Sequence, residues 1–253
     1  MTISITRSKQ IIEIMSILTS DKRFVGKGGN IVIANVIGKT NMLRLSGDID
    51  CTAVSFKDDN EILDCIKKMF PDKHVEITRN SGEKRTLQIS VGDIPIDIET
   101  DKKSYYDIIK YSIYGSDVQG CSFYDILVDK ITVLSSFKIF RRCKDLVDIY
   151  NISTNYNVDS KIFKELYNKS GRQIGDFSAF KIQKDNLEHA YSTLDLGEGA
   201  VKEDFSKVYE TVERFADGIF FDGIWDHNLR SWIIINTGKN VLGLINDLDD
   251  IRK

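Results

Sequence analysis

The chain has 253 residues, of which 42% are hydrophobic and 29% are charged, with only two prolines. This composition predicts an ordered protein with one large core or two smaller ones, and it excludes an extensively disordered chain. The formal net charge of -3 excludes a general nucleic-acid coat protein, because nonspecific binding to phosphates grows with the number of basic contacts, but it leaves room for a local basic surface.

The first ten residues are polar and basic, and no stretch of the sequence approaches the run of roughly 18 apolar residues that a membrane span requires. We therefore expect a cytoplasmic protein without a membrane partner.

The first half of the chain has the patterns of a mixed sheet flanked by helices. Apolar residues at helical spacing predict helices over residues 8–19 and 59–70, the second of which stops before Pro71. Strand-like runs cover residues 46–54, 74–78, 85–91 and 94–99, and residues 80–83 suit a hairpin turn. We expect an α/β (α+β) domain over residues 1–115.

The second half looks helical. Beyond about Tyr105 the strand signals fade, and helical patterns follow over residues 124–136, 142–150, 160–166 and 202–216. We expect a helical bundle domain over residues 116–253. Residues 218–236 suit a strand and a buried helix equally well, because they are rich in aromatic and β-branched side chains, and they are left unassigned.

A glycine pair followed by an amide, Gly28-Gly29-Asn30, stands directly before an apolar run at residues 31–37. If the run opens as a helix, this turn lets phosphates approach backbone N–H groups at the helix N-terminus. The β-branched residues of the run are poor helix formers, so a simple turn into a buried strand is the alternative.

Three aspartates on two expected strands could share a cation. Asp48 and Asp50 lie two residues apart, which places them on one face of a strand. Asp97 stands on the later strand, where Ile96 and Ile98 face the core, so the neighbouring Glu99 is expected to be exposed. Carboxylates are the hard ligands that magnesium or manganese prefers, although alternating acids also occur on solvated strand faces.

Cysteine and histidine do not indicate a site. The four cysteines lack zinc-ligand spacing and are expected to be buried, reduced thiols, and the three histidines have no spaced partner. Trp225 and Trp232 are interpreted as core anchors in preference to a base-stacking surface. Lys138, Arg141, Arg142 and Lys144 form the clearest local basic cluster, and the alternative for them is a solvated helix face.

Several of these patterns together resemble one known family. The Gly28-Gly29 turn is followed by Arg44-x-Ser46-x-Asp48-x-Asp50, by the Asp97 strand, by Asp129-Lys130, and by Arg142-x-Lys144-Asp145-Leu146-x-Asp148. This series is similar to that of the AbiEii-type nucleotidyltransferases, toxins of type IV toxin–antitoxin systems within the DNA polymerase β-like superfamily. The resemblance covers Gly28 to about Tyr150, and it departs from the family at Asn30, where Ser or Thr is usual.

The resemblance implies roles for the matching residues. Asp48, Asp50 and Asp97 become the ligands of Mg²⁺ or Mn²⁺, and Lys130 and Asp145 the other catalytic residues. The resemblance also implies a nucleotide-binding set, comprising Gly28, Gly29, Asn30, Arg44, Ser46, Arg142 and Lys144. Without it, Lys130 would be interpreted as a surface lysine, and Lys144 and Asp148 as an ordinary helix ion pair.

The expected function is metal-dependent transfer of a nucleoside monophosphate from an NTP to an acceptor, the 3′ end of an RNA such as tRNA. Growth inhibition would follow, and a cognate antitoxin is an expected partner. The alternative is a noncatalytic module that keeps the nucleotidyltransferase fold and binds a nucleotide or a protein. The presence of all three aspartates favours the enzyme.

Overall fold

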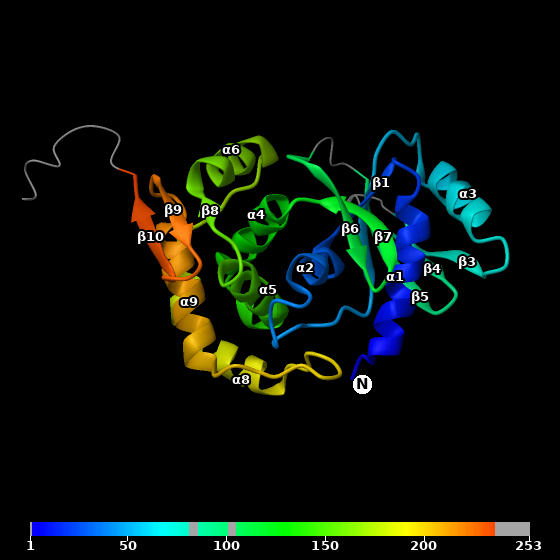
Figure 1. The fold of residues 1–253 in the computed structure, drawn as a ribbon. Helices are drawn as coiled ribbons and strands as arrows, with labels where there is room; N and C mark the ends of the chain where they lie inside the picture. Colours follow the sequence, from blue (N-terminus) through cyan, green and yellow to red (C-terminus); the bar gives the residue numbers. More distant parts are fainter. Residues whose placement is uncertain (1, 81–85, 101–104, 236–253) are drawn as a thin grey trace, which may run out of the picture.

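The computed structural model describes residues 2–80, 86–100 and 105–235. They form a seven-stranded mixed sheet with helices on both faces, followed by a mainly helical part that carries a small three-stranded sheet (Figure 1). The expected α/β class, a mixed sheet followed by helices, is confirmed. None of the helices in this part of the chain is long and apolar enough to cross a membrane.

The large sheet has the strand order β3-β4-β5-β2-β1-β7-β6. Its strands are β1 (Phe24–Lys27), β2 (Ile49–Ala53), β3 (Val75–Arg79), β4 (Thr86–Val91), β5 (Ile94–Glu99), β6 (Ile108–Ile113) and β7 (Ser116–Cys121). β2 pairs with β5 and β1 pairs with β7 in parallel, and the other neighbours are antiparallel. The four predicted strands are confirmed as β2 to β5, whereas β1 was not predicted.

The β6–β7 hairpin corrects the expectation that strands end near Tyr105. The two strands pair from Ile108 opposite Cys121 to Ile113 opposite Ser116. Tyr114 and Gly115 join them with positive φ angles of 50° and 83°, as a two-residue hairpin turn of type I′ requires. Tyrosine is an unusual residue for the first of these positions, so the turn gave no clear signal. The sheet therefore continues past residue 115, where we expected the helical domain to start.

The predicted turn at residues 80–83 falls largely outside the described residues. The strands on either side of it, β3 and β4, pair antiparallel as expected.

Helices cover both faces of the large sheet (Figure 1). α1 (Ile5–Thr19), capped by the Ser4 side chain, packs on β1 and β7, and α3 (Asp59–Met69), capped by Asp58, packs beside β3. α2 (Gly28–Val36) covers the other face and contacts β1 and β2. The glycine pair therefore opens a helix, and the alternative of a turn into a buried strand is wrong: tertiary burial outweighs the low helix propensity of the β-branched residues.

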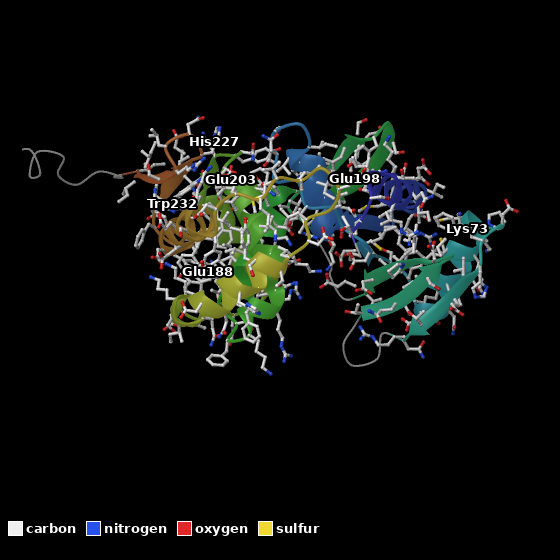
Figure 2. The ribbon with its side chains drawn as sticks, turned by 90° about the horizontal axis from the view of Figure 1, so that it is seen from below. Lys73, Glu188, Glu198, Glu203, His227 and Trp232 are labelled. Atoms are coloured by element: carbon white, nitrogen blue, oxygen red, sulfur yellow. The ribbon has the colours of Figure 1, made fainter. Side chains whose placement is uncertain are left out.

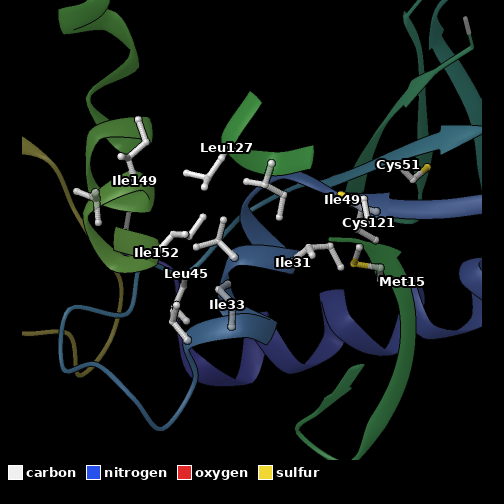
Figure 3. Close-up of a cluster of buried hydrophobic side chains, with 14 of the residues drawn as sticks. Met15, Ile31, Ile33, Leu45, Ile49, Cys51, Cys121, Leu127, Ile149 and Ile152 are labelled. Carbon is white, nitrogen blue, oxygen red and sulfur yellow. The ribbon is translucent and has the colours of Figure 1, made fainter. Parts of the chain in front are cut away.

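α2 lies at the centre of the molecule, between the sheet and the helical part. Figure 3 shows Ile31 on α2 near Met15 of α1, with Leu127 and Ile149 on the opposite side. All four side chains are fully buried. One continuous core therefore joins the sheet to the helices behind it, and α2 is held in place from both sides.

The helical part begins directly after β7. Its helices are α4 (Phe123–Leu134), the short 3-10 helix η2 (Ile139–Arg142), α5 (Cys143–Ser153), α6 (Ser160–Ser170), α7 (Ser178–Ile182), α8 (Lys184–Thr193) and α9 (Phe205–Gly218). The six predicted helices are confirmed as α1, α3, α4, α5, α6 and α9, with ends that differ by a few residues. The short α7 and α8 were not predicted.

The unassigned segment at residues 218–236 contains a hairpin. β8 (Val158–Asp159), β9 (Gly223–Asp226) and β10 (Ser231–Ile234) form the three-stranded sheet. Trp225 is fully buried and its Nε1 donates to the Ser153 carbonyl at 2.7 Å. The partly buried Trp232 stacks on Phe215, with 5.6 Å between ring centroids. Both tryptophans are core anchors, as expected. All four cysteines are free thiols, three of them buried and Cys65 half-buried.

The segment between α8 and α9, residues 194–204, is a strap that reaches back to the sheet. Figure 2 shows Glu198 at the far end of this strap, away from Glu188 and Glu203. Leu196 accepts a backbone hydrogen bond from Leu45 at 2.7 Å, and the Glu198 carboxylate accepts one from the N–H of Ile5 at 2.8 Å. The strap therefore holds the loop before β2 against the rest of the molecule.

Candidate active site

Eleven of the twelve predicted site residues line one pocket of about 210 Å³, where α2, β2, β5, α4 and α5 meet. Its lining consists of Lys27, Gly28, Gly29, Arg44, Ser46, Asp48, Asp50, Asp97, Ile126, Asp129, Lys130, Arg142, Lys144 and Asp145. A larger cavity of about 530 Å³ beside the start of α3 contains none of the predicted residues. The charged residues identify the smaller pocket as the candidate site.

The three aspartates come together because β2 and β5 are parallel neighbours. Asp50 lies opposite Asp97 in the strand register, so both side chains emerge on the same face of the sheet. Asp48 precedes β2 by one residue, and its Oδ1 accepts a hydrogen bond from the Ser46 hydroxyl at 2.7 Å. The expected triad is thus placed by strand pairing, while Ile96 and Ile98 are fully buried on the other face, as predicted.

The surroundings of Asp50 change its acidity. Burial, and after it the neighbouring charge of Asp48, raise its pKa from 3.8 to about 6. Two carboxylates held close together in a poorly hydrated place favour protonation, or a cation that offsets their charge.

The carboxylates of the pocket suit a magnesium ion that takes only part of its ligands from the protein. Within the described residues, no three Asp, Glu, His or Cys side chains are gathered closely enough to ligate one metal ion by themselves. Magnesium commonly binds through one or two carboxylates and completes its shell with phosphates and water. The oxygen donors of the pocket and the raised pKa of Asp50 fit that mode, in which phosphate oxygens and water supply the remaining ligands.

The two glycines are required by close packing. Gly28 has a φ of +68°, and a Cβ atom there would lie 2.1 Å from Asp50 Oδ2. A Cβ atom on Gly29 would lie 2.6 Å from an Arg44 Nη atom and 3.0 Å from Ser46 Oγ. Only glycine lets the start of α2 approach these side chains, and both glycines line the pocket at the N-terminus of the helix.

Asn30 is the predicted residue that the structure places outside the pocket lining. It is 1% exposed, and its Nδ2 donates to the backbone carbonyl of Asp48 at 2.7 Å. Its Oδ1 is buried and has no hydrogen-bond partner within the described part of the chain. In this structure the amide nitrogen of Asn30 holds the Asp48 backbone in place.

Five charged side chains form a continuous ion-pair network behind the carboxylates. Arg44 donates to both oxygens of Asp148, at 3.0 and 2.8 Å. Lys130 Nζ lies 2.6 Å from Asp148 Oδ2 and 2.7 Å from Asp145 Oδ1, and Arg142 Nε lies 2.7 Å from Asp145 Oδ2. The charges alternate from Arg44 to Arg142, with Lys130 at the centre between the two aspartates.

The central members of this network are almost completely shielded from solvent. Asp148 and Asp145 are each 1% exposed, and Lys130 is 7% exposed. Burial alone would raise the pKa of Asp148, but the charges of Arg44 and Lys130 overcome it and lower that pKa to about 2. Lys130 is therefore not a surface lysine, and it keeps one of its three N–H donors for another partner. Within the described residues Asp148 pairs with Arg44 and Lys130, and not with Lys144.

Two further ion pairs at the pocket were not predicted. Lys27 pairs with Glu99, which was expected to be exposed, and Asp129 Oδ1 lies 2.7 Å from Arg172 Nη2. Lys27 stands directly before the glycine pair, and Asp129 stands directly before Lys130. Their positions next to predicted site residues were therefore the signal that could have identified them. Arg172 comes from the loop after α6, and nothing in its own sequence neighbourhood indicates that contact.

The basic cluster divides into two parts. Arg142 and Lys144 line the pocket, whereas Lys138 and Arg141 are exposed on the protein surface. Arg142 connects the two parts, because its side chain lines the pocket and is also 52% exposed.

Comparison with known proteins places the fold. No protein-family model and no curated protein matches the sequence. Among solved structures, a candidate nucleotidyltransferase from H. pylori matches with a TM-score of 0.51 at 15% identity, covering 84% of this chain and 93% of the other. JHP933 from Helicobacter pylori matches with a TM-score of 0.52 at 14% identity over the full length of both chains. At such low identity these similarities show a shared fold.

Proposed function

We propose that the protein is a metal-dependent nucleotidyltransferase that transfers a nucleoside monophosphate from an NTP to the 3′ end of an RNA acceptor such as tRNA. One observation carries this proposal: aspartates from two parallel strands, the start of a glycine-led helix and several cations line the same pocket. The fold shared with a candidate nucleotidyltransferase is in keeping with it.

The chain supplies two kinds of group to a triphosphate. The first N–H groups of α2 and the free donors of Arg44, Lys130 and Lys144 can bind phosphate oxygens, since helix N-termini and charge-assisted donors are suited to anions. Asp48 and Asp50 would hold the divalent cations, with Asp97 completing the set. When bound, such cations neutralise the triphosphate and lower the pKa of a coordinated hydroxyl.

In the proposed reaction the acceptor hydroxyl oxygen attacks the α-phosphorus of the NTP. A new P–O bond forms, the bond to the β-phosphate oxygen breaks, and pyrophosphate leaves. Asp97 orients the hydroxyl and receives its proton. Lys130 offsets the charge that develops on the phosphates, and the carboxylates of Asp145 and Asp148 hold its ammonium in place.

The biological part of the proposal follows from the sequence resemblance. A protein that blocks the 3′ ends of RNA would inhibit growth, as a toxin of the AbiEii type does, and a cognate antitoxin would be its protein partner. Induced expression of the wild type and of Asp48→Asn in a bacterial host tests this role, because only the active chain should slow growth.

The enzymatic test is transfer of label from an α-labelled NTP into total RNA with Mg²⁺ or Mn²⁺. Asp48→Asn should reduce transfer by at least about a hundredfold while leaving the circular dichroism spectrum unchanged, since the lost group acts on the transition state. Asp93→Asn is the matched control, because Asp93 is an exposed acid that pairs with Arg7, away from the pocket.

The noncatalytic alternative predicts a different pattern. In that case Mn²⁺ and NTP would together raise the melting temperature of the wild type and not of Asp48→Asn, yet no labelled RNA and no pyrophosphate would appear. Wild-type transfer rates in Asp48→Asn would contradict the proposed metal site itself.

A further inference from the structure

The segment that joins α4 to α5, residues 135–142, runs between two walls of the pocket. It begins after α4, which carries Lys130, and ends at Arg142, and both of these residues line the pocket. Ile139 is fully buried and anchors the segment in the core. Backbone hydrogen bonds from Ile139 to Ser136 and from Arg141 to Lys138, at 3.1 and 3.0 Å, close its turns. The backbone that carries its exposed side chains is therefore held between α4 and the pocket residue Arg142.

The segment has a distinct charge. Residues 135–144 carry four cations and no acid, in a chain whose net charge is -3. Lys138 and Arg141 are exposed, and the described residues include no ion-pair partner for either. Two uncompensated cations beside a pocket favour an anionic partner at this surface.

Between these cations and α4 stands an exposed aromatic ring, Phe137, which is 66% exposed. A single exposed phenylalanine has no meaning by itself. Phe221 is similar, at 59% exposed, but it stands beside Asp222 and far along the chain from the pocket. Phe137 differs because Lys138 and Arg141 follow it by one and four positions, and because its segment connects two residues of the pocket.

A flat ring beside cations matches single-stranded nucleic acid, whose bases stack on aromatic side chains while basic groups follow its phosphates. We propose that Phe137, Lys138 and Arg141 form a platform for the single-stranded end of the RNA acceptor. The ring stacks against a base, the two cations hold neighbouring phosphates, and the 3′ hydroxyl is thereby directed past Arg142 into the pocket. The RNA identity of this partner rests on the proposed function.

The first test measures binding without NTP or metal, so that it does not depend on transfer. The probe is a fluorescent single-stranded RNA of about 12 nucleotides, a length within the range that single-strand binding sites occupy. Phe137→Ala should weaken binding by about tenfold, and Phe137→Trp should restore it, because the stacking surface is kept. Phe221→Ala, the matched control, should bind as the wild type does.

The salt dependence of binding tests the cations separately. In Lys138→Glu/Arg141→Glu the slope of log affinity against log salt should become shallower by about 1.4, since each phosphate contact to a single strand contributes about 0.7. A blunt RNA duplex should bind more weakly than the single strand, because its bases are already stacked.

The results separate this inference from the proposed function. If Phe137→Ala weakens RNA binding and raises the KM for RNA without changing the KM for NTP, both stand. If RNA binding falls in Phe137→Ala but the wild type transfers nothing, the platform stands and the proposed function is wrong. The platform is wrong if the wild type does not bind the oligonucleotide, if it binds the duplex equally well, or if Phe137→Ala and Phe221→Ala behave alike.

Discussion

Replacing Asp50 by asparagine should stabilise the folded protein at pH 8, although it removes a group of the proposed active site. The pKa of Asp50 is raised from 3.8 to about 6, mainly by burial and then by Asp48. A raised pKa in the folded state means that this carboxyl contributes stability below about pH 4 and loses that contribution as the pH rises through about 6. Above that pH, the ionised Asp50 destabilises the fold.

The size of the effect follows from the pKa difference. A difference of one in pKa corresponds to about 1.4 kcal/mol, so a rise of about 2 sets an upper bound of about 3 kcal/mol at pH 8. Some of this will be lost through relaxation around the new amide, and we expect about 1 to 3 kcal/mol. For a chain of this length that corresponds to roughly 2 to 12 °C in melting temperature.

The assay is thermal unfolding in EDTA from about pH 4 to pH 8, followed by circular dichroism. The gain in Asp50→Asn over the wild type should be largest at pH 8 and should disappear towards pH 4. Asp148→Asn is a control from the same site, for which we expect a loss of stability at pH 8 instead of a gain. Its carboxyl has a pKa lowered to about 2 and pairs with buried cations, so its loss should cost about 3 to 5 kcal/mol at pH 8.

Two results would refute this reasoning. Asp50→Asn could be less stable than the wild type at pH 8, which would mean that the pocket cations already compensate the charge of Asp50. The difference could also be independent of pH, which would mean that the substitution acts through packing instead of through ionisation.

Two other substitutions follow from the packing of the site. Gly28→Ala should lower the free energy of unfolding by about 1 to 2 kcal/mol, because of the positive φ angle of Gly28, and should lower transfer at least tenfold by displacing Asp50. Urea unfolding and the transfer assay measure the two effects, and wild-type activity would contradict the close approach of Gly28 to Asp50. Lys130→Met should lower the free energy of unfolding, measured in urea, by about 3 kcal/mol, because it leaves Asp145 and Asp148 each with one cationic partner fewer. A loss below about 0.5 kcal/mol would mean that Lys130 is not part of the buried ion-pair network.

Periodicity predicted most of the elements that carry a regular apolar face. α1 and α3 follow helical spacing, and β5 was predicted with its observed ends. The four-residue β1 was missed because its residues are too few to show alternation, although it lies inside the sheet, between β2 and β7. The β6–β7 hairpin was missed because an uncommon residue, Tyr114, occupies its turn.

The residues that line the pocket were predictable where they are close to one another in sequence. Asp48 and Asp50 share a strand face by simple alternation, and Gly28 and Gly29 mark the start of α2. The ion-pair network was not predictable in this way, because Arg44 and Asp148 meet only in the folded chain. Local spacing suggested a Lys144–Asp148 pair, and long-range contact gave Asp148 to Arg44 and Lys130 instead.

The pairing of Arg44 with Asp148 also bears on how the protein is made. The two residues are separated by 104 positions. At synthesis rates of about 5 to 20 residues per second, a ribosome that has added Arg44 needs roughly 5 to 20 s more to add Asp148. During most of that interval the growing chain lacks a complete β7 beside β1, and α5, which closes the pocket, begins only at Cys143. The pocket of a nascent chain therefore cannot be complete until more than half of the protein has been translated.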